Sequence, residues 1–202
     1  MSRIAAIILA AGASSRLGEP KQLLDLGGQP VLAHTLAAVR QTSLAPLFVV
    51  LGHAADEIEQ RIDLHEVQMI HNLDYSSGQS SSVRAALHVL PPDVDAVVFI
   101  LGDQPLVAPA VIERLADAYG TGNASIIQPN YREGRGNPVL ISRALFEELA
   151  QITGDTGARP LIQRHRDAIH LVDVTAFSRP DDIDTREDYE RIQRAFSARH
   201  NE

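Results

Sequence analysis

The sequence predicts an α/β fold in which a mostly parallel sheet lies between two layers of helices. Three runs of strand length are apolar throughout, as in strands buried on both faces of a parallel sheet: residues 4–9, 47–51 and 96–101. Segments with helical periodicity separate these runs, which is the alternation typical of such sheets. The 202 residues are enough for one sizeable core and too few for two ordinary domains, so we expect a single domain.

The remaining elements follow from local patterns. Pro30 at the first turn and a helical spacing of apolar residues predict a helix over residues 31–39. Similar patterns predict strands at 67–70, 124–128 and 169–174, and helices at 54–62, 81–90, 111–119, 142–149 (capped by Ser142), 159–166 and from Thr185 to near Phe196. The glycine-broken basic segment 131–141 interrupts this alternation and runs into a strand. We expect it to form an inserted hairpin over the open edge of a ligand pocket, with an ordinary flexible hairpin as the alternative.

The composition excludes several classes of function. With 18 Lys and Arg against 26 Asp and Glu, the net charge of −8 disfavours binding to nucleic acid, and any anionic ligand needs a local positive pocket. The absence of cysteine excludes disulfides, a thiolate nucleophile and Cys-ligated zinc. Residues 1–11 are apolar but too short to span a membrane, and they lack the basic start of a signal peptide. We therefore expect a cytoplasmic protein without membrane association.

The stretch after the first predicted strand has the features of a phosphate-binding loop, and we call residues 10–21 the phosphate loop. Residues 10–13, Ala-Ala-Gly-Ala, carry almost no side chain, so a ligand can approach the backbone N–H groups closely. Ser14 and Ser15 add hydroxyl donors. Arg16 supplies a flat fork of donors suited to phosphate, and Lys21 a mobile charge that can follow a leaving pyrophosphate. These features predict the triphosphate end of a nucleotide site.

Two commoner phosphate loops do not fit this spacing. A Walker loop requires Gly-Lys-Ser/Thr, whereas here Glu19 and Pro20 separate Gly18 from Lys21. A dinucleotide fingerprint requires a third glycine where Ser15 stands, which disfavours a redox enzyme that uses a dinucleotide.

Two later segments carry polar groups to predicted element ends. Residues 72–84 form a polar, serine-rich loop that leads into a helix, and its serines either cap that helix or face a ligand close to Gly78.

Asp103 follows the apolar run 96–101, at the end of a parallel strand where such sheets bind ligands. It is placed to hold Mg²⁺, because Arg16 and Lys21 alone cannot neutralise a triphosphate. The alternative is a simple turn before Gln-Pro.

The acidic cluster near the C-terminal helix has a structural explanation. Thr185 followed by Asp188 is typical of a capping box, and carboxylates are favourable at a helix start. We therefore expect Asp181, Asp182 and Asp188 to serve only the beginning of that helix.

The phosphate loop and several later motifs resemble one known superfamily. The pattern Leu9-Ala-Ala-Gly-x-Ser-Ser-Arg-Leu-Gly-x-Pro-Lys21-Gln-Leu-Leu resembles the N-terminal signature of the MobA-like NTP transferases. More narrowly, the chain is similar to the molybdenum cofactor cytidylyltransferase (MocA-like) branch, and the motifs extend from residue 4 to residue 189. This resemblance implies a three-layer α/β/α Rossmann-like (GT-A-like) fold, with a nucleotide half at about 1–105 and an acceptor half at about 106–202.

The resemblance also implies a role for particular residues. Asn137 stands where the branch more usually has histidine, so a role tied to that histidine does not transfer. The expected catalytic residues are Arg16, Lys21 and Asp103, and the expected Mg²⁺ ligands are Asp103 and Asp184. The expected nucleotide contacts are Leu9, Ala10, Ala11, Gly12, Lys21, Gly78, Ser80 and Ser81; the expected acceptor contacts are Asn137, Pro138, Asp155 and Arg159. The Gly-Asp-x-Gly-Ala-Arg segment that holds the last two can also be explained as a tight turn before a helix.

These inferences together predict a Mg²⁺-dependent nucleotidyltransferase. The resemblance implies CTP as donor, the phosphate of molybdopterin as acceptor, and an apo-molybdoenzyme as a possible recipient. Three alternatives stay open: another nucleotide or a sugar-phosphate acceptor, a non-catalytic cofactor delivery protein, and, more weakly, a dinucleotide-dependent redox enzyme.

Overall fold

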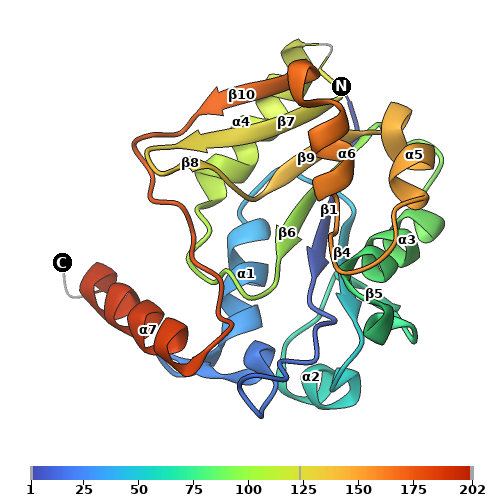
Figure 1. Ribbon diagram of the computed structural model, residues 1–202. Helices are drawn as coiled ribbons and strands as arrows, with labels where there is room; N and C mark the ends of the chain where they lie inside the picture. The colour runs from blue at the N-terminus through green and yellow to red at the C-terminus, as the bar shows by residue number, and fades with distance from the viewer. Residues whose placement is uncertain (1, 123, 201–202) are drawn as a thin grey trace.

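The fold is organised around β1 (Ile4–Leu9), the strand that delivers the phosphate loop (Figure 1). The computed structural model describes residues 2–122 and 124–200. In the described part, β1 lies in an eight-stranded sheet of order β10-β7-β9-β6-β1-β4-β5, and β8 pairs with β7. The other strands are β4 (Leu47–Leu51), β5 (Gln68–His71), β6 (Ala96–Leu101), β7 (Ile126–Tyr131), β8 (Gly134–Arg135), β9 (Val139–Ser142) and β10 (Ile169–Asp173).

Most neighbouring strands of this sheet are parallel. β1 pairs in parallel with β4 and β6, with Ile7 opposite Phe48 on one side and Phe99 on the other. β4 with β5 and β7 with β10 are also parallel pairs, whereas β9 runs antiparallel to both β6 and β7. The predicted fold class, a mostly parallel sheet of an α/β protein, is confirmed.

Alternate side chains of β1 point into two separate cores. Ala6 and Ile8 are fully buried against α1 (Val31–Val39), α2 (Ala55–Arg61) and α4 (Pro109–Thr121). Ala5 and Ile7 are fully buried against α3 (Gln79–Val89), α5 (Phe146–Ala150) and α6 (Arg159–Arg164). A strand that is apolar on both faces therefore has a helical layer on each side.

The last helix, α7 (Arg186–His200), stands apart from these layers (Figure 1). It packs through Tyr189 and Ile192 on Leu26 of the small hairpin formed by β2 (Asp25–Leu26) and β3 (Gln29–Pro30). This contact joins the end of the chain to the segment directly after the phosphate loop.

The predicted insertion at residues 131–141 is wrong in its placement. β7 and β8 do form a hairpin, but β9, which follows it, lies in the middle of the sheet, and all four of its residues are buried. The apolar run that begins at Val139 is an internal strand, because it can bury side chains on both faces. Ser142 ends this strand and makes no capping hydrogen bond; a 3-10 turn (Arg143–Leu145) leads to α5 instead.

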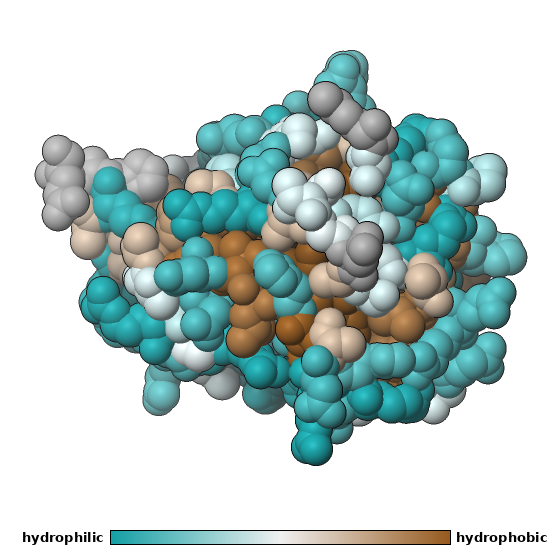
Figure 2. Space-filling view, turned by 90° about the horizontal axis from the view of Figure 1, so that it is seen from above, coloured by the Kyte–Doolittle hydropathy of each residue, from teal (hydrophilic) through white to brown (hydrophobic). Residues whose placement is uncertain are grey.

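Seen from above, from the side on which β1 begins, the molecule shows apolar residues in the centre of a largely hydrophilic face (Figure 2). Among the described residues, no helix combines the length and apolarity needed to cross a bilayer.

Truncating the central strand should be costly. Ile8→Ala removes a fully buried side chain, and we expect the free energy of unfolding to fall by about 2–5 kcal/mol, because the lost contacts leave a cavity. Urea unfolding measures this difference. Leu73→Ala, at a side chain that is 92% exposed, is the control and should change stability by less than about 0.5 kcal/mol. Equal losses in the two variants would contradict the packing described above.

Candidate active site

A cleft of about 750 Å³ lies at the carboxyl ends of β1 and β6, where open α/β sheets bind their ligands. Its walls come from five separated segments: the phosphate loop, the turn and first residues of α3, the end of β6, the segment around the start of α6, and the segment before α7. The lining residues with charged or hydroxyl side chains are Ser14, Ser15, Arg16, Lys21, Tyr75, Ser76, Ser77, Ser82, Asp103, Asp155, Arg159, Asp182 and Asp184.

The buried side chain of Gln22 fixes the backbone of the phosphate loop. This side chain is 1% exposed, and its Nε2 donates to the carbonyl oxygens of Ala10 at 2.7 Å and Gly12 at 3.1 Å. The hydroxyl of Ser14 accepts a hydrogen bond from the Lys21 N–H at 3.0 Å, and Ser14 itself has a positive φ of 53°. A Cβ added to Gly12 would meet no atom within 4 Å, so this part of the loop borders open space. The quoted motif contains Gln22 but predicts no role for it, because this role depends on the folded path of the loop.

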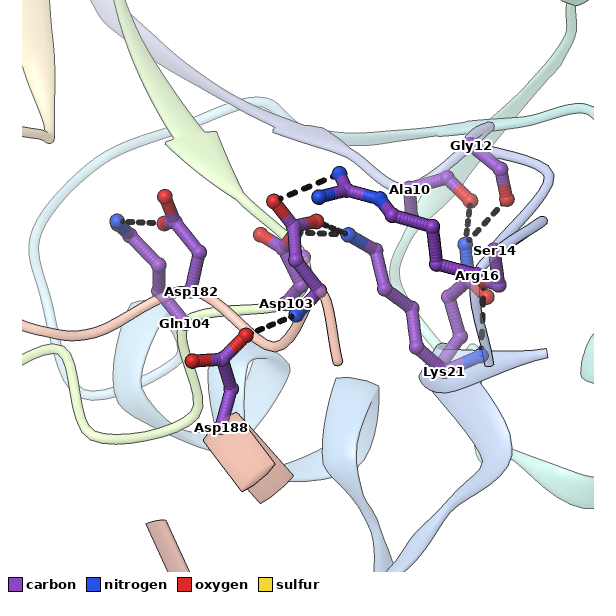
Figure 3. A network of polar contacts seen from close by, with 12 residues as sticks. Ala10, Gly12, Ser14, Arg16, Lys21, Asp103, Gln104, Asp182 and Asp188 are labelled. Carbon is purple, nitrogen blue, oxygen red and sulfur yellow. Dashed lines mark hydrogen bonds and ion pairs between the residues drawn. The ribbon is translucent and has the colours of Figure 1, made fainter. Parts of the chain in front are cut away.

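The centre of the cleft is an ionic cluster (Figure 3). The Lys21 Nζ lies 2.5 Å from an Asp103 oxygen and 2.9 Å from an Asp184 oxygen, and the other Asp184 oxygen lies 3.0 Å from the Arg16 guanidinium. The side chains of Lys21 and Asp103 are 14% and 15% exposed, whereas that of Arg16 is 66% exposed. The four charged residues predicted to act together are therefore brought to one place. Lys21 is also the only lysine in the sequence.

The charges in this cluster shift the pKa values of their neighbours. Burial alone would lower the pKa of Lys21, but the charges and hydrogen bonds of Asp103 and Asp184 outweigh it and raise that pKa. For Asp184, burial opposes ionisation, yet contacts with Lys21 and Arg16 lower its pKa overall. The pKa of Asp182 is raised, by burial first and then by the neighbouring charge of Asp103. The cluster thus favours a charged Lys21 paired with carboxylates at neutral pH.

Hydrogen bonds attach the segment before α7 to the end of β6. The Ile183 N–H donates to the Asp103 carbonyl at 3.2 Å, and Gln104 Nε2 donates to an Asp182 oxygen at 2.5 Å. Ile183 is fully buried. The expectation that Asp182 serves only a helix start is wrong, because Asp182 precedes α7 by several residues and lines the cleft. A capping pattern covers only a few neighbouring residues, so it could not predict the contact between Asp182 and Gln104.

The predicted capping box at the start of α7 is confirmed. The Asp188 carboxylate accepts hydrogen bonds from the Thr185 N–H at 2.9 Å and the Thr185 hydroxyl at 2.7 Å, and the Asp188 N–H donates back to that hydroxyl. The Asp184 N–H also donates to Asp188, at 3.3 Å. The box therefore fixes the backbone beside Asp184. Asp181, which also lies outside α7, pairs with Arg191 of that helix at 3.0 Å.

The arrangement of Asp103 and Asp184 suits a divalent cation with oxygen ligands. Both carboxylates approach a single ammonium group, so they already share one cation between them. In the part of the chain that the structure describes, no group of three or more His, Asp or Glu side chains is arranged to hold a metal ion. A metal here would complete its coordination with water or with the oxygens of a bound phosphate.

The other predicted contacts are divided between the cleft and its surroundings. Residues 9–12 and Gly78 line the cleft, as do Asp155 and Arg159. Ser80 and Ser81 are buried and do not line the cleft; Asn72 donates to the Ser81 hydroxyl at 2.8 Å. Asn137 and Pro138 lie between β8 and β9, also outside the cleft lining, and the Asn137 carbonyl accepts from the Tyr131 hydroxyl at 2.7 Å.

The fold is Rossmann-like, with a charged cleft at the strand ends, and sequence comparison identifies the family of the chain. Residues 6–169 match the family described as the MobA-like NTP transferase domain. The chain therefore belongs to this family, which confirms the resemblance that the phosphate loop predicted.

Solved structures from mycobacteria are similar over nearly the whole chain. A homologue of Rv0371c from Mycobacterium sp. strain JC1 has a TM-score of 0.90 and 37% identity, covering 97% of this chain and 98% of that one. A manganese complex of Rv0371c from Mycobacterium tuberculosis H37Rv has a TM-score of 0.85 and 34% identity, covering 96% of this chain and 100% of that one.

Two curated relatives differ in the length that they share. The bifunctional protein GlmU of Kineococcus radiotolerans is 37% identical over 127 residues, which cover 60% of this chain and only 26% of GlmU. Nicotine blue oxidoreductase of Paenarthrobacter nicotinovorans is 28% identical over 200 residues, which cover 94% of this chain and 96% of that protein. The chain thus spans about a quarter of GlmU and nearly all of the oxidoreductase.

The capping box gives a pH-dependent prediction. Hydrogen bonds, first from the Thr185 hydroxyl, lower the pKa of Asp188 from 3.8 to about 2. A depressed folded-state pKa stabilises the protein above the unfolded value, and this contribution is lost as the pH falls from about 4 towards 2. Asp188→Asn should therefore lower the free energy of unfolding by about 1 kcal/mol at pH 7.

Urea unfolding of the parent and of Asp188→Asn between pH 3 and pH 7 measures this effect. The difference between them should be constant above about pH 5 and shrink below about pH 4. A difference that stays constant down to pH 3 would argue against a depressed pKa at Asp188.

Proposed function

We propose that this protein is a divalent-metal-dependent nucleotidyltransferase that transfers CMP from CTP to the phosphate of molybdopterin and releases pyrophosphate. The observation that carries the proposal is the meeting of Arg16, Lys21, Asp103 and Asp184 in one cleft at the strand ends. Membership of an NTP transferase family supports the reaction class. The choice of CTP and molybdopterin rests on the sequence motifs of the MocA-like branch.

The proposed reaction requires positioning and charge neutralisation without a side-chain nucleophile. An oxygen of the acceptor phosphate attacks the α-phosphorus of the nucleotide. The bond from that phosphorus to the oxygen bridging to the β-phosphate breaks, and pyrophosphate leaves with the electron pair. Residues 9–12 and Gly78 would bind the nucleotide, with Ser82 beside them and Ser80 and Ser81 supporting that turn from beneath. Arg16 and Lys21 would stabilise the leaving pyrophosphate.

Asp103 and Asp184 would hold Mg²⁺ together with phosphate oxygens. When bound, the ion would neutralise charge on the α-phosphate and favour in-line attack. Two observations support a divalent metal: the predicted ligands Asp103 and Asp184 offer only oxygen atoms, and the relative Rv0371c has been solved as a manganese complex. Because Lys21 lies between the same two carboxylates, it would have to move towards the phosphates as the metal binds.

The acceptor would bind beside Arg159, with Asp155 in the same wall of the cleft. A guanidinium in this wall can pair with the acceptor phosphate while the nucleotide occupies the phosphate loop. Asn137 and Pro138 would contribute from the loop between β8 and β9, through a part of the acceptor that extends beyond the cleft.

A redox function is the second candidate, because nicotine blue oxidoreductase matches the chain over nearly its full length. Ser15 stands where a dinucleotide fingerprint needs glycine, which argues against it. Oxidation of NADH or NADPH by nicotine blue in the presence of the protein, without pyrophosphate release from any nucleotide, would favour the redox function. A delivery protein would show neither activity.

Replacing the metal-binding carboxylate should abolish transfer. With Mg²⁺, CTP and molybdopterin, the parent should release pyrophosphate, and Asp103→Asn should reduce kcat by on the order of 100- to 1000-fold, because charge at the α-phosphate is left uncompensated. A coupled pyrophosphate assay measures both. Asp63→Asn, the same substitution at a side chain that is 77% exposed and outside the cleft, is the matched control and should retain parental activity.

A nucleotide panel in a thermal shift assay, with and without Mg²⁺, tests the donor independently of the acceptor. We expect the largest Mg²⁺-dependent stabilisation with CTP. Absence of pyrophosphate release together with unchanged CTP binding by Asp103→Asn would overturn the proposed transferase and favour cofactor delivery.

Removing the lysine should strengthen metal binding in the absence of nucleotide. Lys21→Ala leaves Asp103 and Asp184 without their shared cation, so the affinity for Mn²⁺ should rise by about tenfold or more, since a unit charge close to a divalent ion costs over 1 kcal/mol even in water. Calorimetric titration with MnCl₂ measures this affinity. Arg61→Ala, which removes an exposed cation paired with Glu57, is the control and should leave it unchanged. Weaker Mn²⁺ binding by Lys21→Ala would contradict a shared site.

A further inference from the structure

Two wall segments of the cleft, far apart in the sequence, are hydrogen-bonded to each other. The N-terminal end of α3 contributes its cap residue Gly78 together with Gln79 and Ser80, and the loop before α6 contributes Gly154 and Asp155. The Gln79 N–H donates to the Asp155 carboxylate at 3.1 Å, and the Ser80 N–H donates to the Gly154 carbonyl at 3.1 Å. The start of α3 is thus bonded to a loop 76 residues further along the chain.

These bonds supply the cap that α3 lacks. The first N–H groups of a helix have no partner within the helix, and a neighbouring side chain normally satisfies one of them. The N-cap position of α3 is Gly78, which has no side chain to do so. Asp155, which belongs to the loop before α6, provides the missing carboxylate cap. Its negative charge is favourable at the positive end of the 11-residue helix.

The contact is close enough to require glycine at position 78. Gly78 has a φ of +98°, and a Cβ there would lie 2.6 Å from the Gly154 carbonyl carbon and 2.7 Å from the Asp155 nitrogen. Gly157 has a φ of +52°, and a Cβ there would lie 2.3 Å from the Gln79 Oε1. At Gly78, backbone therefore packs directly on backbone, whereas at Gly157 the close atom belongs to the Gln79 side chain. A change in one loop must displace the other.

Both loops face the ligand space. Gly78 and Gln79 line the cleft on the side of α3, and Asp155 and Arg159 line it on the side of α6. Asp155 is therefore bonded to the expected nucleotide-binding turn while it stands four residues from Arg159, the expected acceptor contact.

We propose that Asp155 is a positioning residue for the nucleotide, which fixes the turn at Gly78 and Gln79 by capping α3. The inference rests on the proposed function and extends it. Motif position alone assigns Asp155 to the acceptor, whereas its hydrogen bond to the Gln79 N–H assigns it a role in binding the nucleotide. The loop before α6 then serves both substrates: Asp155 sets the shape of the nucleotide pocket, and Arg159 meets the acceptor.

Two substitutions at Asp155, compared with one at Arg159, test this role. Asp155→Ala removes the cap, and the Kd for CTP with Mg²⁺ should rise about 3- to 30-fold, the range expected for a lost helix cap. Asp155→Asn keeps an oxygen that can accept from the Gln79 N–H, so its Kd should stay within about threefold of the parent. Arg159→Ala should raise the KM for molybdopterin and leave the Kd for CTP unchanged.

Amide hydrogen exchange without ligand reports the cap directly. The Gln79 N–H should exchange on the order of tenfold faster in Asp155→Ala and close to the parental rate in Asp155→Asn. Thermal unfolding midpoints confirm that each variant is folded. Should Asp155→Ala be unfolded, Asp155→Ser, whose shorter side chain also loses the contact, replaces it in both measurements.

The outcomes separate this inference from the proposed function. Parental CTP affinity in Asp155→Ala, in a parent that binds CTP, overturns the positioning role and leaves the transferase intact. A parent that binds no nucleotide overturns both. Unchanged Gln79 exchange in Asp155→Ala overturns the cap even where CTP binding is weakened.

Discussion

The structure depends above all on one ammonium group held between two carboxylates. Lys21 comes from the phosphate loop, Asp103 from the end of β6 and Asp184 from the segment before α7, so a single contact joins three parts of the chain. The pair formed by Lys21 and Asp103 is mostly shielded from water, where charges interact more strongly than at the surface. Leaving one partner of such a pair unpaired is costly. The supporting hydrogen bonds of Ile183, Gln104 and Asp188 hold the acidic segment in place for this contact.

The fold brings these groups together through strand order. β1 and β6 are parallel neighbours with Leu9 opposite Leu101, so the phosphate loop and Asp103 leave the sheet side by side. The small hairpin β2–β3 then packs against α7, which returns the end of the chain to the same edge. Asp184 thereby reaches Lys21 although 163 residues separate them. The parallel sheet thus brings Lys21 close to Asp103, and the packing of α7 outside the sheet brings Asp184 to the same place.

The sequence patterns predicted those elements whose structure is decided by their own residues. The strands at 4–9, 47–51 and 96–101 and the helix at 31–39 have the predicted bounds, because each is a strongly apolar or periodic segment between clear breaks. The phosphate loop was also recognisable from its residue types. The place of β9 was not, since strand order in a mixed sheet is set by packing. The roles of Gln22 and Asp182 were missed for the same reason: each contacts a partner that only the folded chain brings near. The hydrogen bond between the Gln79 N–H and Asp155 is likewise a contact that no local pattern reveals.

The balance of charge in the cleft explains why a cation is part of the proposed reaction. Three cationic side chains, Arg16, Lys21 and Arg159, face four acidic ones, Asp103, Asp155, Asp182 and Asp184, so the lining has a formal charge of −1. The whole chain carries −8, which adds no attraction for an anion. A triphosphate at this site would therefore meet a phosphate loop whose two cations, Arg16 and Lys21, are already paired with carboxylates. A divalent ion taken up by Asp103 and Asp184 would reverse this balance, because it neutralises the acids and frees Lys21 for phosphate. The same carboxylates that repel a bare nucleotide would thus select one that arrives with its metal.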